Sequence, residues 1–298
     1  MAVDAFIAYL SHERNYSPHT LKAYRKDLED CTSFLQISNE ESSLEEATYG
    51  EIRNWIVYMV EDGLSNRSVN RKITSLKSYY KFLLKVGVLK SNPLTGHKAL
   101  KTSKKMEIPF SQAEMSTLFT ELPFEDNFEG IRDRLIIELF YATGIRRAEL
   151  INLRLADLDL TNRSIKVLGK RNKERIIPLL MSTKTLFEAY LNERQQLNHS
   201  EESEYLFLTA KGNKVYETLV YRIINGYFRE VSSKVKRSPH ILRHTFATHM
   251  LNQGADLNSV KELLGHSSLA STQVYTHNSI AELKKVHSRA HPRNKKEL

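Results

Sequence analysis

The sequence predicts a mainly α-helical protein with a small β-sheet, organised as two domains. Three observations lead to this prediction. Apolar residues recur at helical spacing along most of the chain, one segment at residues 164–179 alternates around a polar tip, and a Lys-rich stretch at residues 97–105 carries little apolar content. We therefore expect a helical N-terminal domain, a connector, and a second domain that combines helices with a hairpin.

The composition is that of a folded globular protein. Of 298 residues, 41% are hydrophobic and 27% are charged, which excludes a mostly disordered or collagen-like chain. No apolar run approaches the roughly 18 residues that span a bilayer, and the first residues include acids without a basic region, so we expect neither a membrane span nor an export signal. Cys31 is the single cysteine, so internal disulfides and multi-cysteine zinc sites are excluded and a cytoplasmic location is expected.

The formal net charge of +9 predicts a polyanionic partner. Residues 1–97 carry 12 basic and 12 acidic side chains, whereas residues 98–298 carry 32 and 23, so the surplus lies in the second part of the chain. Within the first part, the stretch 64–92 contains seven basic side chains and no acid. It is either a solvated helix face or a surface for phosphate contacts, which position a protein on DNA without reading its sequence.

Capping signals mark the helices of the first domain, which we place at residues 1–97. Ser17-Pro18 begins one helix, and Thr48 with Glu51 forms a capping box for a second, which Gly63 ends. A third begins near Asn66 and stops before Gly87. Residues 98–108 are expected to be a Lys-rich linker, and residues 109–298 a second domain.

The second domain is predicted to be mostly helical around one hairpin. Ser111 and Glu114 cap a helix, and Gly144 ends the next. The hairpin occupies residues 164–179 with a basic tip, and the apolar run 205–208 could add a third strand to it.

Two places in this domain suggest phosphate chemistry. Ser238-Pro239 begins a helix that carries His240 and Arg243 three residues apart, on one face near the positive end of the helix. The histidines of this helix could alternatively bind zinc, but the Glu of a His-Glu-x-x-His site is missing. Arg146 follows the helix-ending Gly144, where a rigid turn can aim a guanidinium, although an arginine beside Glu149 is more often a surface ion pair.

Five motifs occur in the order found in the tyrosine site-specific recombinases: Thr-Gly-Ile-Arg-Arg-Ala-Glu-Leu from Thr143, Gly-Lys in the hairpin, His-Ile-Leu-Arg-His from His240, Leu-Gly-His, and Val-Tyr-Thr-His. The chain resembles this family over nearly its entire length. Within the family it is most similar to the bacterial XerC and XerD group, because the N-terminal helical segment, Asn-Lys-Glu-Arg after the hairpin Lys, and the ending from His287 to Arg293 are also similar.

The resemblance implies six catalytic residues: Arg146, Lys170, His240, Arg243, His266 and Tyr275. Arg146 and Arg243 would bind the non-bridging phosphate oxygens, since a guanidinium forks onto two oxygens and stays charged. Tyr275 would be the nucleophile and His240 its base, while His266 would donate to the phosphate and Lys170 would protonate the departing 5′ oxygen.

Two positions depart from the family pattern. Arg171 follows Lys170 where close relatives commonly have Gly, so Lys173 is a competing cation, and Arg147 stands where a small apolar residue is usual.

The family further implies a SAM-like core-binding domain, a C-shaped clamp on double-stranded DNA, and a covalent 3′-phosphotyrosine whose formation needs no metal, ATP or other cofactor. A tetramer on DNA is implied, alone or with a related second recombinase, with C-terminal segments near residues 280–283 exchanged between protomers. The Xer likeness suggests resolution of chromosome dimers at division, with a septal DNA translocase as activator. A phage or mobile-element integrase and a non-cleaving DNA-bridging protein are the alternatives.

Overall fold

The computed structural model divides the chain into two compact units, residues 1–105 and 106–298. The boundary falls within the Lys-rich stretch that the sequence marks as a linker. Each unit has its own hydrophobic core and is described by itself. The structure describes residues 2–38, 40–103, 107–169, 173–197, 204–234, 236–265 and 277–294. For Ser38 and residues 277–282 it describes the backbone and not the side chains.

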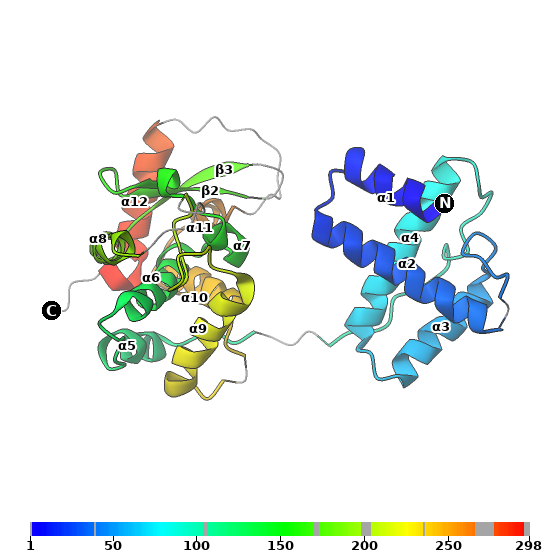
Figure 1. Cartoon of the computed structure of the whole chain (residues 1–298), viewed down its shortest axis with the longest axis horizontal. Coiled ribbons are helices and arrows are strands. Elements are labelled where there is room, and N and C mark those ends of the chain that lie inside the picture. The colour runs from blue at the N-terminus through cyan, green and yellow to red at the C-terminus, as the bar shows by residue number, and fades with distance from the viewer. Residues whose placement is uncertain are drawn as a thin grey trace. The chain divides into compact units, whose positions relative to one another are not determined.

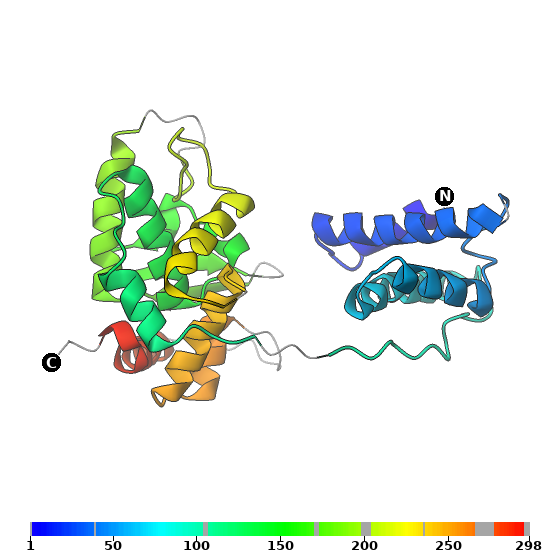
Figure 2. The same cartoon turned by 90° about the horizontal axis from the view of Figure 1, so that it is seen from below.

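The described residues of the N-terminal unit form four helices: α1 (Ala2–His12), α2 (Pro18–Ser38), α3 (Tyr49–Glu61) and α4 (Asn66–Lys85). They form two layers, with α1 and α2 over α3 and α4 (Figure 2). The predicted caps are confirmed, because Thr48 and Glu51 make the full capping box of α3 and the backbone N–H of Thr20 donates to Ser17 Oγ at 3.3 Å. Gly63 follows α3 with a positive φ of 85°.

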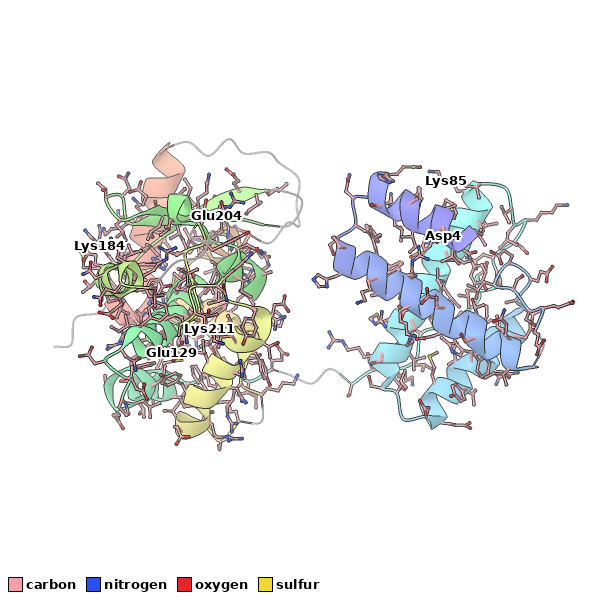
Figure 3. The ribbon with its side chains drawn as sticks, viewed as in Figure 1. Asp4, Lys85, Glu129, Lys184, Glu204 and Lys211 are labelled. Atoms are coloured by element: carbon pink, nitrogen blue, oxygen red, sulfur yellow. The ribbon has the colours of Figure 1, made fainter. Side chains whose placement is uncertain are left out.

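The basic stretch 64–92 is largely helix α4, and part of its charge is neutralised within the unit. Arg71 donates two hydrogen bonds, of 2.6 and 2.7 Å, to the buried carboxylate of Asp27, and Lys72 lies 2.6 Å from Asp30. Lys85, labelled in Figure 3, pairs with Glu13 at 3.1 Å. The acids of α2 therefore fix much of this face of α4. The basic side chains of the stretch that pair with no described residue are Arg67, Lys81 and Lys90.

The second unit is mainly helical, with one small sheet toward one edge (Figure 1). Its helices are α5 (Gln112–Thr120), α6 (Phe128–Thr143), α7 (Arg147–Ile151), η1 (Leu155–Asp157), α8 (Met181–Gln195), α9 (Glu217–Val231), α10 (Pro239–Asn252), α11 (Leu257–Leu264), α12 (His277–Ala290) and η3 (Pro292–Asn294). The predicted fold class, mainly α with a small sheet, is thus confirmed. Within the described part of the chain, no helix combines the length and the apolar character that a membrane crossing requires.

The sheet is antiparallel with the order β1 (Leu158–Asp159), β2 (Ser164–Leu168), β3 (Glu174–Pro178). The predicted hairpin is β2 and β3, in a register that pairs Val167 with Arg175. The expected third strand at 205–208 is wrong: that run forms only isolated bridges, to Arg154 and Lys214, and β1 takes the third place. The apolar run is instead buried beside α8, where Tyr190 and Arg194 hydrogen-bond its backbone.

Helix α6 is the centre of the second unit. From Leu135 to Ile145 every side chain is buried, and the helix packs against α8 and α10. Apart from Glu138, the second half of this helix is apolar on nearly every side, which explains why the surrounding helices enclose it. Because α6 ends at Gly144, its C-terminal end is a fixed point from which the next residues project.

Candidate active site

Three of the six predicted catalytic residues lie within the described chain: Arg146, His240 and Arg243. Lys170, His266 and Tyr275 lie outside the described residues. The glycines that precede two of them, Gly169 and Gly265, are described, so the structure shows where the chain enters each of these segments.

Arg146 is positioned by the turn at the end of α6. Gly144 adopts a left-handed conformation with φ of 60°, and a Cβ at this position would lie 2.5 Å from Phe246 Cδ1. Only glycine fits there, since a side chain would meet both backbone strain and a packed ring. Two residues later, Arg146 directs its guanidinium to Glu149 at 2.7 Å and to the carbonyl oxygen of Gly265 at 3.0 Å. Its side chain stays 34% exposed, so the guanidinium remains accessible to a ligand.

Arg243 projects from α10 into the same place but is buried. Its Nη1 donates to the carbonyl oxygen of Gly144 and its Nη2 to that of Leu264, the latter at 2.6 Å. Burial, followed by the positive charge of Arg146, lowers the pKa of Arg243 to about 9. The guanidinium is therefore still charged at neutral pH, and an anion placed beside it would relieve the repulsion.

Two further residues of the site, Glu149 and Arg175, were not predicted from the sequence. Glu149 is buried, so the ordinary interpretation of a surface ion pair with Arg146 is wrong. Arg175 comes from β3 and makes a two-point ion pair with the Glu149 carboxylate, at 2.9 and 2.8 Å. Burial alone would raise the pKa of Glu149, but the hydrogen bonds and charges of Arg175 and then Arg146 outweigh it, so that pKa is lowered.

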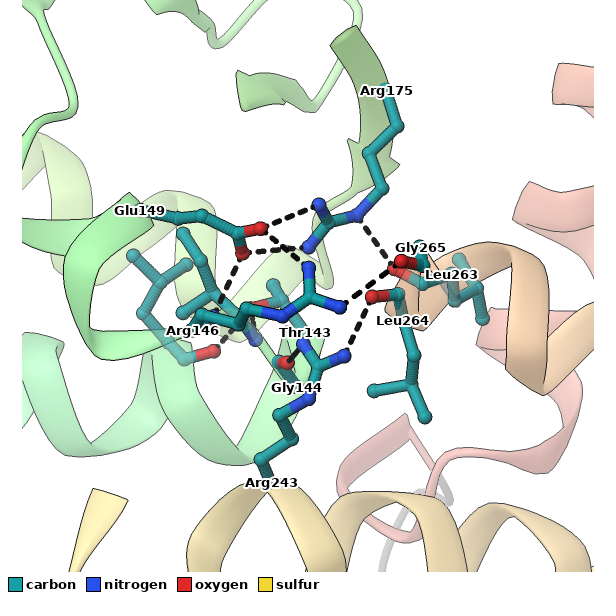
Figure 4. Close-up of polar contacts among 11 residues, drawn as sticks. Thr143, Gly144, Arg146, Glu149, Arg175, Arg243, Leu263, Leu264 and Gly265 are labelled. Carbon is teal, nitrogen blue, oxygen red and sulfur yellow. Dashed lines mark hydrogen bonds and ion pairs between the residues drawn. The ribbon is translucent and has the colours of Figure 1, made fainter. Parts of the chain in front are cut away.

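Three arginines bind the last carbonyl oxygens of α11 and the residue after it (Figure 4). Leu263 accepts from Arg175 at 2.9 Å, Leu264 from Arg243, and Gly265 from Arg146. The C-terminal end of a helix carries partial negative charge, which cations stabilise. We call Arg146, Arg175, Arg243 and Glu149 the arginine cluster. With three guanidinium groups and one carboxylate it carries two positive charges in excess, a balance that favours an anion beside it.

The segments of Lys170 and His266 both begin at the arginine cluster. A Cβ on Gly169 would lie 3.7 Å from both Arg175 Nη1 and Glu149 Oε1, and the N–H of Gly169 donates to the carbonyl oxygen of Lys173 at 2.8 Å. A Cβ on Gly265 would lie 3.1 Å from Arg175 Nη1. The chain thus passes the cluster immediately before each of these two predicted catalytic residues.

His240 lies in the first turn of α10 and is exposed, whereas Arg243, one turn further, is buried. Among the described residues, His240 has no hydrogen-bonding partner. The zinc alternative required the histidines of α10 to converge, but His249 is buried and bonded through Nδ1 to the Tyr141 hydroxyl at 2.9 Å, while His244 is exposed. In the part of the chain that the structure describes, no three His, Cys, Asp or Glu side chains are grouped to hold a metal ion.

The C-terminal helix α12 is fixed to α6 of the same chain. His287 Nε2 bonds the carbonyl oxygen of Ala142 at 2.6 Å, and His291 Nε2 bonds that of Tyr141 at 3.0 Å. Leu283 is buried in the core of the same unit. The expected contact of residues 280–283 with another protomer stays a prediction, and the side chain of Ile280 lies outside the described residues.

Comparison with protein families matches residues 110–282 to the phage integrase family and residues 3–87 to the N-terminal SAM-like domain of phage integrases. The first match spans more than half of the chain and includes the whole arginine cluster. The chain belongs to the phage integrase family. It is accordingly a tyrosine recombinase.

Relatives in the phage integrase family match the chain from end to end. It is 41% identical to the tyrosine recombinase XerC of Staphylococcus epidermidis over 296 residues, 98% of each chain. The identity to XerC of Oceanobacillus iheyensis is also 41%, over 98% of this chain and 96% of that protein.

Solved structures show the same fold. The Tn1549 transposon integrase, in complex with transposon right end DNA, has a TM-score of 0.72 at 20% identity, covering 96% of this chain and 99% of that one. The XerH site-specific recombinase bound to its difH substrate has a TM-score of 0.68 at 21% identity, covering 94% and 83%.

Proposed function

We propose that this tyrosine recombinase cuts and rejoins double-stranded DNA at a specific site through a covalent 3′-phosphotyrosine. The observation that carries the proposal is the arginine cluster, whose two excess positive charges lie where the turn after α6, β3, α10 and α11 meet. A phosphodiester is already anionic and gains charge as a fifth oxygen approaches phosphorus. Fixed guanidinium groups stabilise that charge without rearranging during the reaction.

The family resemblance supplies the roles that we propose for the six residues. Arg146 and Arg243 bind the non-bridging oxygens of the scissile phosphate. The hydroxyl of Tyr275 attacks phosphorus and gives its proton to His240, since a phenol of pKa near 10 needs proton removal to react at neutral pH. The bond to the 5′ oxygen breaks, and Lys170 donates a proton to that oxygen. His266 donates a hydrogen bond to the phosphate.

Rejoining is the reverse of cleavage, with the 5′ hydroxyl of a different DNA strand as the attacking group. Because the phosphotyrosine retains the energy of the broken ester, a free 5′ hydroxyl can displace Tyr275 and restore a DNA backbone. The proposed chemistry therefore consumes no ATP and assigns no step to a metal.

The relatives favour an Xer-type role. Identity of 41% to XerC proteins over nearly the entire chain supports the resolution of chromosome dimers before division, in the cytoplasm. Recombination joins two duplexes with two protomers on each, so we propose a tetramer on DNA, formed by this chain alone or with a related second recombinase. A septal DNA translocase is the proposed activator.

A nicked suicide substrate tests the proposal. The nick is placed just downstream of the cleavage site. The short fragment that carries the new 5′ hydroxyl then diffuses away after cleavage, which traps the covalent complex. The full-length protein should accumulate an adduct on denaturing gels and Tyr275→Phe should not. Tyr221→Phe, an exposed tyrosine of α9, is the matched control and should behave as wild type. An adduct with Tyr275→Phe would overturn the assignment of the nucleophile, and no adduct with wild type on its bound site would favour a non-cleaving DNA-bridging protein.

A further inference from the structure

We infer that Arg175, to which the resemblance assigns no role, is a positioning residue for strand cleavage: it holds Glu149 and the end of α11 so that Arg146 faces the scissile phosphate. This inference rests on the proposed function. It concerns a side chain that need not touch the DNA, and it is carried by the contacts of Arg175 with Glu149 and Leu263 and by its close approach to Gly265.

Arg175 joins three segments that each lead to a predicted catalytic residue. It lies on β3, paired with Val167, with only the pair Leu168–Glu174 between it and the connecting segment that contains Lys170 in the sequence. Its Nη1 and Nη2 bind Glu149, in the helix that begins after Arg146. Its Nε donates to the carbonyl oxygen of Leu263 at 2.9 Å, three residues before His266. Among the described residues of the arginine cluster, Arg175 alone contacts all three segments.

The two arginines compete for one carboxylate. Glu149 Oε1 accepts from Arg146 at 2.7 Å and from Arg175 at 2.9 Å. While Arg175 neutralises the Glu149 carboxylate, the positive charge of Arg146 is left to attract an anion. If Arg175 lost its charge, the buried carboxylate would have Arg146 as its remaining ionic partner, and the excess charge of the cluster would fall from two to one. Arg146 would then be held in an internal ion pair instead of being available to the phosphate.

Arg175 also supports the backbone to which Arg146 is bonded. Gly265 has a φ of 64°, and an added Cβ would come within 3.1 to 3.3 Å of Nη1, Cδ and Cζ of Arg175. The backbone before His266 thus lies against the guanidinium of Arg175, at a distance that glycine permits. The carbonyl oxygen of the same glycine accepts from Arg146. A change in Arg175 is therefore transmitted to Arg146 along two routes, Glu149 and Gly265.

The competing explanation is that Arg175 is only a buried ion pair that stabilises the unit. Arg194 provides the comparison, because it is also buried and also donates to backbone carbonyl oxygens, those of Tyr205 and Leu206, away from the cluster. Arg194→Gln is thus a matched control for the loss of a buried guanidinium.

The experiment measures the single-turnover rate of adduct formation on the nicked substrate at saturating full-length protein, the DNA affinity and the thermal midpoint. It compares wild type, Arg175→Gln, Arg194→Gln and the double variant Arg175→Gln/Glu149→Gln. We expect Arg175→Gln to lower the rate by about 100-fold with at most about a threefold change in DNA affinity. Removing the carboxylate in the double variant should recover at least about fivefold of that rate, because Arg146 is then released.

Two results would overturn the inference: equal rates for Arg175→Gln and Arg194→Gln at a temperature where both are folded, or a double variant slower than Arg175→Gln. If Arg175→Gln does not fold, Arg175→Lys keeps the positive charge but makes fewer hydrogen bonds. Its single-turnover rate at saturating protein should fall by about tenfold with the adduct still formed. A wild-type rate for Arg175→Lys would also overturn the inference. Failure of wild type to form any adduct would instead contradict the proposed function.

Discussion

Arg146 and Gly265 are 119 positions apart in the sequence, yet the guanidinium of Arg146 donates a 3.0 Å hydrogen bond to the carbonyl oxygen of Gly265. This bond joins the turn after α6 to the end of α11. It brings the segment that leads to His266 to the arginine that would bind phosphate. The candidate active site therefore forms only when helices that are far apart in the sequence of the second unit have packed together.

Replacing Arg243 by lysine should nearly abolish cleavage while DNA binding persists. A lysine keeps the positive charge but lacks the planar fork of a guanidinium. It therefore cannot bond the carbonyl oxygens of Gly144 and Leu264 and face a phosphate at the same time. The loss of one positioned donor for the transition state costs roughly 100- to 1000-fold in rate.

Single-turnover cleavage and a gel-shift titration check this prediction for Arg243→Lys. Arg229→Lys, on α9 and outside the cluster, is the control and should cleave as wild type does. Cleavage by Arg243→Lys within a few-fold of wild type would show that charge alone suffices.

Gly144→Ala should destabilise the second unit by about 2 to 4 kcal/mol, because φ is 60° and the new methyl group would lie 2.5 Å from Phe246 Cδ1. Gly226→Ala is the matched control. Gly226 lies within α9, and no atom is within 4 Å of an added Cβ, so this change should stabilise the protein by about 0.5 to 1 kcal/mol. Urea unfolding of the full chain measures both, and shifts of the same sign would contradict the packing described at the turn.

Low pH should loosen α12 from α6. Burial lowers the pKa of His287 to about 4, and burial followed by the charge of His287 lowers that of His291 to about 3, from an ordinary 6.5. Since the unfolded chain takes up these protons first, the stability is fully present above pH 6.5 and is lost as the pH falls towards these values. Each histidine contributes about 2 kcal/mol between pH 7 and pH 5.

The variant His287→Gln tests this pH dependence, because glutamine donates to the carbonyl oxygen of Ala142 without titrating. Its free energy of unfolding should fall less between pH 7 and pH 5 than that of wild type. Replacing His287 also removes its effect on the pKa of His291, which reduces the pH dependence further, so parallel pH curves would mean that His287 is not buried as described.

The ion pair of Glu138 and Arg293 should be worth more than an exposed pair. Glu138 is fully buried, and its carboxylate lies 3.1 Å from Arg293, which follows α12 and stacks over Phe119 at 4.4 Å. Arg293→Met leaves a buried charge without its partner and should cost roughly 3 kcal/mol. Arg147→Met breaks the exposed pair with Glu217 and should cost less than about 1 kcal/mol. Equal losses in thermal unfolding would contradict the burial of Glu138.

Local signals in the sequence were sufficient for much of the fold. The capping boxes at Thr48 and Ser111 and the stop at Gly144 each depend on neighbours within four residues, and the structure confirms all three. The hairpin was likewise a local pattern of alternation. The run 205–208 failed because apolar character shows that a segment is buried but not whether it joins a sheet, and this one is bridged to Arg154 and Lys214 instead.

The candidate site was only partly predictable. Arg146, His240 and Arg243 stand in motifs, whereas Glu149 and Arg175 act through contacts between distant segments. One signal could have identified Arg175: in the alternating strand β3 it occupies an inward-facing position with Ile177, and an arginine facing a core requires a buried partner. The sequence alone could not name that partner, because Glu149 lies 26 positions away on a different element.

Protease mapping of the trapped protein–DNA complex tests the central claim most directly. Digestion followed by mass spectrometry should find the nucleotide on the peptide that contains Tyr275, joined to the 3′ phosphate of the cut strand, with a free 5′ hydroxyl on the other end. A nucleotide on a serine, on another tyrosine or joined through a 5′ phosphate would contradict the account.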